Sequence, residues 1–312
     1  MAAAIPIPPK PRVAVLIGPT AAGKTGAALE LAEGLGAEIV NADSLQVYRE
    51  LDIGTAKPTL KERARAPHHL VDVADPPEPY DAARYTQEGR AALLELHHRG
   101  VAPLVVGGTG LYIKALLYGL FPQGARDQEE RARLRQELAQ EGLTPLFERL
   151  QRLDPSTAAR LQPADTYRVL RALEVMAATG RPLSALINAH RFRDCPYEVI
   201  KLGLRLPREE LYRRIEQRVE AMLAAGWLDE VKGLLAHYPP DLKPFQALGY
   251  RHLINFLKGR WSWEEALELL KRDTRRYAKR QLTWFRADPE IKWFAPDEMG
   301  EMRACLERFF GD

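Results

Sequence analysis

The chain has 312 residues and a mass of 35.2 kDa, enough for two domains or for one domain with an insertion. Hydrophobic residues make up 46% and charged residues 28% of the sequence, values that exclude a disordered or fibrous protein. No run of 18 apolar residues occurs, so we expect no membrane span, and the first 12 residues are too short and too proline-rich for a signal peptide. The two cysteines, Cys195 and Cys305, have no metal-ligand spacing and form no disulfide framework, which favours a reducing cytoplasm.

The charge is unevenly distributed along the chain. Residues 271–286 contain seven Lys or Arg and one Asp, so this stretch carries +6 in a chain whose net charge is +3. The rest of the protein is therefore mildly acidic. One basic stretch on an acidic body predicts a localised contact with a polyanion.

Short apolar runs alternate with helical patterns in the first 120 residues. Strands are predicted at residues 12–17, 37–40, 70–73 and 102–106, and helices from about 24 to 35 and over 80–99. Strands that alternate with helices indicate a parallel sheet covered on both faces.

The pattern changes after Pro122. Residues 127–190 show only helical periodicity, broken by prolines into three or four short helices. A strand is predicted at 197–206, and helices follow to the end of the chain at 208–225, 246–258 and 263–286. A helical block between strands of one sheet is best interpreted as an insertion. We therefore expect a core domain of residues 10–122 plus 191–312 and a helical insertion domain of residues 123–190.

A phosphate-binding loop follows the first predicted strand. The sequence GPTAAGKT fits the pattern G-x-x-x-x-G-K-T and lies directly before a helix, the context that supports this motif. The two glycines allow the backbone N–H groups to wrap around phosphate oxygens, the lysine adds a positive charge, and the threonine hydroxyl can bind Mg²⁺. The motif predicts an α/β fold with a P-loop NTPase-like parallel sheet and a diphosphate or triphosphate site at Gly18, Pro19, Thr20, Ala21, Ala22, Gly23, Lys24 and Thr25.

Two further strand ends carry candidate site residues. Asp43 follows the second strand, where ligands bind in open parallel sheets. Three roles are open for its carboxylate: a ligand of Mg²⁺, a general base, or the N-cap of the following helix. The fourth strand runs into Gly107-Gly108-Thr109-Gly110 and lacks the acidic residue that most phosphate-loop hydrolases place there, which argues against a motor ATPase or a GTPase. The glycines indicate either room for a closely approaching group or a tight turn.

Six segments together resemble the tRNA dimethylallyltransferase family, also called tRNA isopentenyltransferases. In chain order they are GPTAAGKT, NADSLQVYRELDIGTAKP, GGTGLYIKALLYGL, DTYRVLRALEV, FQALGYRH and TRRYAKRQLTWFR, and the resemblance covers residues 13–286. It implies transfer of a dimethylallyl group from dimethylallyl diphosphate to N6 of adenosine 37, beside the tRNA anticodon, with release of diphosphate.

The resemblance also implies roles for individual residues. Lys24, the loop amides and Mg²⁺ would stabilise the leaving diphosphate, Asp43 would be the general base, and Thr109 would complete the catalytic group. Apart from the resemblance, Arg218 could reach the diphosphate from its place on the predicted helix 208–225, after the last predicted strand. The insertion would close over the RNA, and the adenine would leave the loop stack. The positions implied to contact tRNA are Asp43, Ser44, Leu45, Gln46, Thr109, Arg131, Tyr167, Arg168, Val169, Leu170 and Arg171, where Tyr167 stands in place of the Gln found in many members.

The basic stretch adds a candidate RNA-binding surface. Helical spacing places Arg272, Arg276, Lys279 and Arg280 on one face, and Arg276 and Arg280 are predicted to contact tRNA phosphates. The neighbouring Trp284 and Phe285 are expected in the core and not as platforms for base stacking.

Two other functions remain open from the residues alone. A P-loop nucleoside or small-molecule kinase would share the loop and consume ATP, but it gives no account of the basic helix. An RNA-binding module with a vestigial loop would show no turnover. The intact Lys24, Thr25 and Asp43 argue against this alternative. For the prenyltransferase we expect Mg²⁺ as cofactor, the tRNA anticodon stem-loop and dimethylallyl diphosphate as partners, no membrane, a cytoplasmic location and a monomer.

Overall fold

The computed structural model describes residues 10–120, 128–190 and 195–311. The chain divides into two compact units, one formed by Met1–Leu117 with Pro196–Asp312 and the other by Tyr118–Cys195. The domain boundaries expected at residues 122–123 and 190–191 fall at segments 121–127 and 191–194, which lie outside the described residues.

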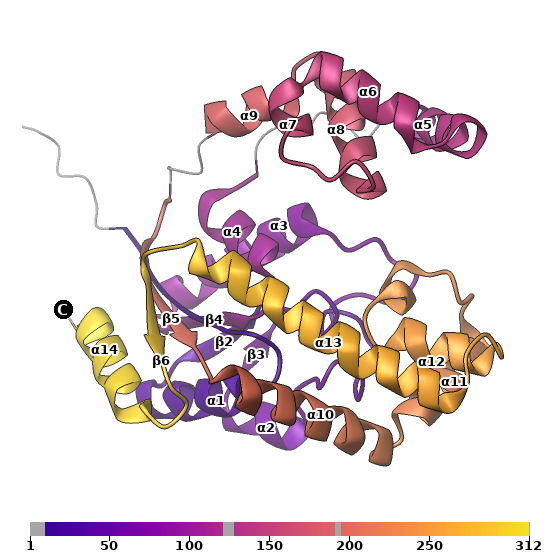
Figure 1. The fold of residues 1–312 in the computed structure, drawn as a ribbon. Coiled ribbons are helices and arrows are strands. Elements are labelled where there is room, and N and C mark those ends of the chain that lie inside the picture. The colour runs from indigo at the N-terminus through magenta and orange to yellow at the C-terminus, as the bar shows by residue number, and fades with distance from the viewer. Residues whose placement is uncertain (1–9, 121–127, 191–194, 312) are drawn as a thin grey trace, which may run out of the picture. The chain divides into compact units, whose positions relative to one another are not determined.

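A six-stranded parallel sheet organises the larger unit, in the order β3-β2-β4-β1-β5-β6 (Figure 1). Its central strand, β1, is buried from Val13 to Ile17, as expected of a strand that is covered on both faces. The predicted α/β fold with a P-loop NTPase-like parallel sheet is confirmed. The strands are β1 (Arg12–Ile17), β2 (Glu38–Asn41), β3 (His68–His69), β4 (Pro103–Gly107), β5 (Glu198–Leu204) and β6 (Ile291–Phe294).

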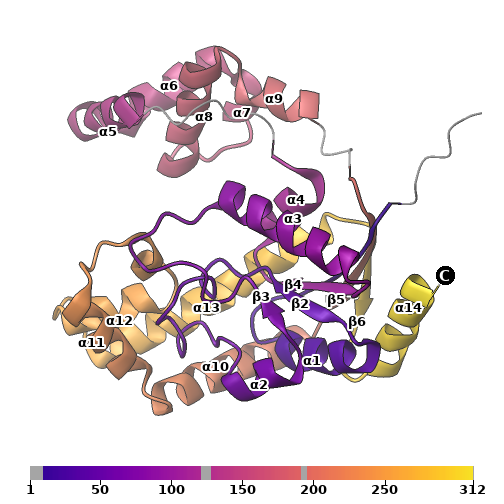
Figure 2. The ribbon, with the colours of Figure 1, turned by 180° about the vertical axis from the view of Figure 1, so that it is seen from behind.

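Helices cover the two faces of this sheet (Figures 1 and 2). α1 (Lys24–Leu35) and α14 (Met299–Gly311) pack together on one face with α2 (Leu60–Arg65) beside them, and α3 (Ala82–His98) and α4 (Gly110–Tyr118) lie on the other. The remaining helices extend from the carboxyl ends of the strands, and α10 packs along α13 there. They are α10 (Arg208–Ala224), α11 (Trp227–His237), the 3₁₀ turn η1 (Lys243–Gln246), α12 (Tyr250–Leu257) and α13 (Trp263–Arg286).

The smaller unit has a core of its own, to which Leu134, Leu150 and Val169 contribute. Buried Asp154 joins two of its helices because its carboxylate accepts hydrogen bonds from the side chains of Thr157 (2.7 Å) and Ser184 (2.6 Å). The described part of this unit contains five helices, where the sequence predicted three or four: α5 (Gln128–Glu141), α6 (Leu143–Leu153), α7 (Pro155–Ala158), α8 (Thr166–Thr179) and α9 (Leu183–His190).

Three predicted elements of the larger unit were wrong. The strand expected at 70–73 is instead His68–His69, because Leu70 (φ 61°) and Asp72 (φ 57°) adopt the left-handed conformation, which ends an extended chain. The helix expected at 246–258 begins only at Tyr250, after Gly249 with φ 91°. The C-terminal region is not all helical, because β6 adds an edge strand that pairs with β5.

Candidate active site

The phosphate loop follows β1, where the sequence predicts it. Gly23 caps α1 with φ 93°, a left-handed conformation that favours glycine, and α1 begins at Lys24. The N-terminus of α1 therefore faces the loop, so its unpaired N–H groups and helix dipole favour an anion there.

Two cations meet beside this loop. The Nζ of Lys24 donates hydrogen bonds to the carbonyl oxygens of Gly18 (3.0 Å) and Pro19 (2.9 Å). Burial and the nearby Arg218 cation lower the pKa of Lys24 to about 8, although Asp43 opposes them. Burial also lowers the pKa of Arg218, and Asp43 again opposes the shift. Two desolvated cations with one carboxylate leave an excess of positive charge that suits an anionic ligand.

Asp43 lies two residues beyond the end of β2. Its Oδ1 accepts hydrogen bonds from the backbone N–H groups of Leu45 (2.9 Å) and Gln46 (3.4 Å), the contacts of a cap. The Oδ1 of Asn41 accepts a hydrogen bond from the N–H of Asp43 at 3.2 Å and so fixes its backbone. Because Asp43 also lines the cavity of the site, its capping role is compatible with a chemical one.

Thr109 connects the loop of Asp43 to the end of β4. Its N–H donates to the carbonyl oxygen of Ala42 (3.1 Å), and its Oγ1 accepts a hydrogen bond from the N–H of Ser44 (3.1 Å). Gln46 is held differently, because its Nε2 donates to the carbonyl oxygens of Thr55 and Ala56, each at 3.1 Å. The side-chain amide of Gln46 therefore stabilises the protein loop through its Nε2.

The glycines at the end of β4 and just beyond it make room for other parts of the protein. A Cβ atom on Gly107 would lie 2.2 Å from the carbonyl oxygen of Ala42, one on Gly108 would lie 2.3 Å from the Nε2 of Gln281, and one on Gly110 would lie 2.3 Å from the Nε1 of Trp284. Of the two interpretations open from the sequence, a close approach is the better one, but the approaching groups are Ala42, the residue after β2, and helix α13.

A cavity of about 390 Å³ joins these groups, within the size range of small-molecule sites. Helices α10 and α13 flank it. Along α10 the lining changes from Arg218, near Lys24, to Met222 and then to Trp227 at the start of α11. The cavity is thus charged beside the phosphate loop and more apolar away from it, where its lining includes Val219, Met222, Trp227, Leu248 and Leu270.

Helix α13 brings Gln281 and Tyr277 to this cavity, and neither residue was predicted from the sequence to belong to the site. Gln281 is buried, its Oε1 accepts a hydrogen bond from the N–H of Thr20 (2.9 Å), and its Nε2 donates to the carbonyl oxygen of Gly108 (2.9 Å). Tyr277 lines the cavity, and burial together with the charge of Asp43 raises its pKa. The sequence contains one sign of Gln281: it is a polar residue at a position that helical spacing places on the buried side of α13, four residues before Phe285.

Magnesium would depend on few protein ligands here. The described residues contain no group of three His, Cys, Asp or Glu side chains that could hold a metal ion. Thr25 lines the cavity beside Lys24, and Mg²⁺ often binds through few protein groups together with substrate phosphates and water. The donor set of the site therefore fits an ion bound together with a diphosphate.

The basic face of α13 is partly neutralised. Asp273 forms ion pairs with Arg272 (3.1 Å) and Arg276 (3.4 Å). The side chains of Arg276 and Arg280 are nevertheless exposed to solvent. Trp284 is 49% exposed, so the prediction that it belongs to the core is wrong. Phe285 is buried, as predicted. The indole of Trp284 lies against Gly110 at the start of α4.

The predicted RNA-contacting residues of the smaller unit divide by burial. Tyr167 is 74% exposed and Arg168 pairs with Asp165 (2.7 Å) on the surface. Arg131 and Arg171 both pair with Glu174, at 3.4 and 3.0 Å. Val169 is 0% exposed and the half-buried Leu170 packs against the same core, so the side chains of these two residues contribute to the fold of this unit.

Comparison with known proteins decides between the functions left open. The family model described as IPP transferase matches residues 46–288, and the model described as isopentenyl transferase matches residues 11–67. A tRNA dimethylallyltransferase of Syntrophobacter fumaroxidans is 54% identical over 283 residues, which cover 90% of this chain and 83% of that protein. One from Geobacter sulfurreducens is 50% identical over 304 residues, covering 97% and 98%. The chain belongs to the tRNA dimethylallyltransferase family.

Solved structures of the family agree. The full-length tRNA isopentenylpyrophosphate transferase of Bacillus halodurans matches with a TM-score of 0.73 and 36% identity, covering 97% of both chains. A eukaryotic dimethylallyltransferase acting on tRNA matches with a TM-score of 0.81 and 28% identity, covering 96% of this chain and 77% of that one. Membership in this family supports tRNA prenylation over the kinase alternative. Within the described residues, no helix is both long and apolar enough to span a membrane.

Proposed function

We propose that this tRNA dimethylallyltransferase transfers the dimethylallyl group of dimethylallyl diphosphate to N6 of adenosine 37 in the tRNA anticodon stem-loop. The cavity beside the phosphate loop carries the proposal, because it combines two desolvated cations, Lys24 and Arg218, with apolar walls. A short hydrocarbon ester of diphosphate has the same two-part chemistry.

The charged end of the cavity would bind the diphosphate. Backbone N–H groups of Gly23, Lys24 and Thr25 at the start of α1, together with the cations of Lys24 and Arg218, would hold its oxygens. These groups would stabilise the charge that develops as the bond between C1 and the diphosphate oxygen breaks. Thr25 would hold a Mg²⁺ ion, which when bound would neutralise part of the diphosphate charge.

Asp43 would serve as the general base. The adenine N6 amine attacks C1, the N6–C1 bond forms, and the bonding electrons of the C1–O bond leave with the diphosphate. Asp43 would accept the proton that N6 loses, and Thr109 would complete the catalytic group by fixing Ser44 beside Asp43. Because an exocyclic amine is a weak nucleophile, holding it next to C1 would supply much of the acceleration.

The tRNA would contact both units of the protein. Ser44, Leu45 and Gln46 border the cavity, where the extruded adenine would enter. Exposed Arg276 and Arg280 would contact phosphates. In the smaller unit, Arg131, Tyr167, Arg168 and Arg171 would contact the RNA. We further propose that the enzyme acts as a monomer in the cytoplasm.

Nucleoside analysis tests this function directly. Purified protein is incubated with unmodified tRNA, dimethylallyl diphosphate and Mg²⁺, and the digested nucleosides are analysed by mass spectrometry. We expect dimethylallyladenosine at position 37, with one pyrophosphate released for each product formed. Inorganic pyrophosphate should compete with the donor, and ATP should not be consumed. Formation of ADP in step with a product would contradict the proposal.

A further inference from the structure

The segment between β2 and α2 shapes one side of the cavity. It contains Asp43 and Gln46, and its backbone is unusual. Glu50 (φ 64°) and Ala56 (φ 47°) adopt the left-handed conformation, as do Leu70 and Asp72 in the segment packed against it. In the described part of the chain, the other non-glycine residue with positive φ is Ala21 of the phosphate loop. Such conformations persist only where surrounding contacts impose them.

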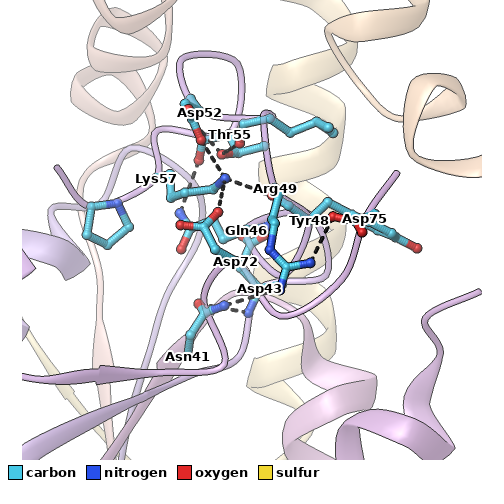
Figure 3. A network of polar contacts seen from close by, with 12 residues as sticks. Asn41, Asp43, Gln46, Tyr48, Arg49, Asp52, Thr55, Lys57, Asp72 and Asp75 are labelled. Atoms are coloured by element: carbon cyan, nitrogen blue, oxygen red, sulfur yellow. Dashed lines mark hydrogen bonds and ion pairs between the residues drawn. The ribbon is translucent and has the colours of Figure 1, made fainter. Parts of the chain in front are cut away.

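Lys57 supplies the central contact of this region. Its side chain is only 2% exposed, and its ammonium lies among three oxygen atoms (Figure 3). The Nζ donates hydrogen bonds to the carbonyl oxygen of Tyr48 (2.7 Å), to the Oδ1 of Asp52 (2.5 Å) and to the Oδ1 of Asp72 (2.6 Å). The three N–H donors of an ammonium can serve three oxygens in this arrangement.

The partners of Lys57 lead directly to the site residues. The N–H of Asp72 donates to the carbonyl oxygen of Gln46 at 3.2 Å, so Asp72 connects Lys57 with the backbone of Gln46. The Nε2 of Gln46 in turn donates to the carbonyl oxygens of Thr55 and Ala56, the two residues before Lys57. The N–H of Gln46 belongs to the cap of Asp43. Three hydrogen bonds thus connect the surroundings of Lys57 with Gln46, and a fourth joins Gln46 to Asp43.

We propose that Lys57 is a positioning residue for prenyl transfer, whose buried ammonium holds Gln46 and Asp43 in place at the cavity through Tyr48, Asp52 and Asp72. The inference rests on the proposed function. Lys57 does not line the cavity and is not expected to touch donor or RNA. The phosphate loop has its own support in α1 and Gln281, so donor binding should not depend on Lys57.

The chain offers a matched control in Lys201. This lysine on β5 is 5% exposed, and its Nζ pairs with the carboxylates of Asp288 and Glu290, each at 2.7 Å. Lys57→Met and Lys201→Met each remove a buried ammonium that is shared between two carboxylates. Both variants should lose thermal stability, but only Lys57→Met removes contacts to the loop of Asp43.

The experiment compares these variants with the unaltered enzyme at a temperature where all are folded by circular dichroism. Dimethylallyl diphosphate affinity is measured by calorimetry, and the single-turnover rate is measured at saturating donor and tRNA. We expect Lys57→Met to keep the donor Kd within twofold and to lose at least tenfold in rate, while Lys201→Met keeps both. Equal rates in the two lysine variants would overturn the inference. Absence of transfer by the unaltered enzyme would instead refute the proposed function.

A second substitution covers the case in which Lys57→Met does not fold. The side chain of Asp52 is 63% exposed, so Asp52→Asn removes one ion pair of Lys57 with little effect on burial. We expect this variant to fold, to bind donor normally and to lose several-fold in the single-turnover rate. An unchanged rate in Asp52→Asn, with Lys57→Met unfolded, would assign Lys57 to stability alone and overturn the inference.

Discussion

Gln281 donates a hydrogen bond to the carbonyl oxygen of Gly108 at 2.9 Å, joining helix α13 to the end of β4. Its other amide atom accepts a hydrogen bond from the N–H of Thr20 in the phosphate loop. A single buried side chain thus holds the loop, the β4 end and the basic helix together.

The first prediction concerns this amide. Gln281→Leu leaves the N–H of Thr20 and the carbonyl oxygen of Gly108 without their partner, which should lower the free energy of unfolding by about 1–3 kcal/mol. Gln281→Glu keeps an acceptor for Thr20 but adds a negative charge beside the proposed diphosphate site, so donor affinity should fall further than in Gln281→Leu. Urea unfolding and calorimetry measure the two effects. Gln217→Leu on the exposed face of α10 is the control, and normal donor affinity in Gln281→Glu would contradict the proposed binding site.

The second prediction separates the two roles of Asp43. Asp43→Asn keeps an Oδ1 that can accept from Leu45 and Gln46, so its stability should stay within about 1 kcal/mol of the original. The single-turnover rate should nevertheless fall by roughly 10²–10⁴, because an amide does not accept the N6 proton. Asp81→Asn is the matched control, since Asp81 caps α3 through the same kind of contacts. A normal rate in Asp43→Asn would leave Asp43 as a cap only.

The third prediction follows from the lowered pKa of Lys24. With a pKa of about 8, Lys24 loses its proton in the free enzyme as the pH rises through that value. Donor affinity should therefore fall above pH 8, by up to about tenfold per pH unit, because the neutral amine no longer attracts the diphosphate. Bound diphosphate should favour the charged form, so binding at pH 8.5 should take up protons.

Calorimetry in buffers of different ionisation enthalpy measures this proton uptake. Lys24→Arg provides the control, because a guanidinium stays charged throughout this range and should remove the pH dependence. A donor affinity that is constant from pH 7 to 9.5 in the unaltered enzyme would contradict this account of Lys24.

The fourth prediction tests the basic face of α13. Removing two phosphate contacts with Arg276→Ala and Arg280→Ala should flatten the log–log dependence of tRNA affinity on salt by roughly 1–2 units. Arg303→Ala with Arg308→Ala removes the same charge from α14 and should leave the slope unchanged. Filter binding over a range of salt concentrations measures both slopes. If the two double variants have the same slope, Arg276 and Arg280 make no contact with tRNA phosphates.

The sequence by itself predicted the local features of this protein well. The phosphate loop, the helix that starts at Lys24 and the helix over 263–286 are encoded by contiguous residues, because a strand, a glycine turn and a helical repeat are short-range patterns. The family could also be recognised from such motifs, whose order along the chain is itself specific.

Only the tertiary structure decided which distant residues share the site. Tyr277 and Gln281 join Lys24, Asp43 and the expected Arg218 because α10 and α13 pack along one another beside the carboxyl ends of the strands. The strand β6 forms through pairing with β5, and Lys57 owes its role to an ammonium buried among oxygens from Tyr48, Asp52 and Asp72. These features depend on contacts between residues far apart or in an irregular loop, and no local periodicity encodes them.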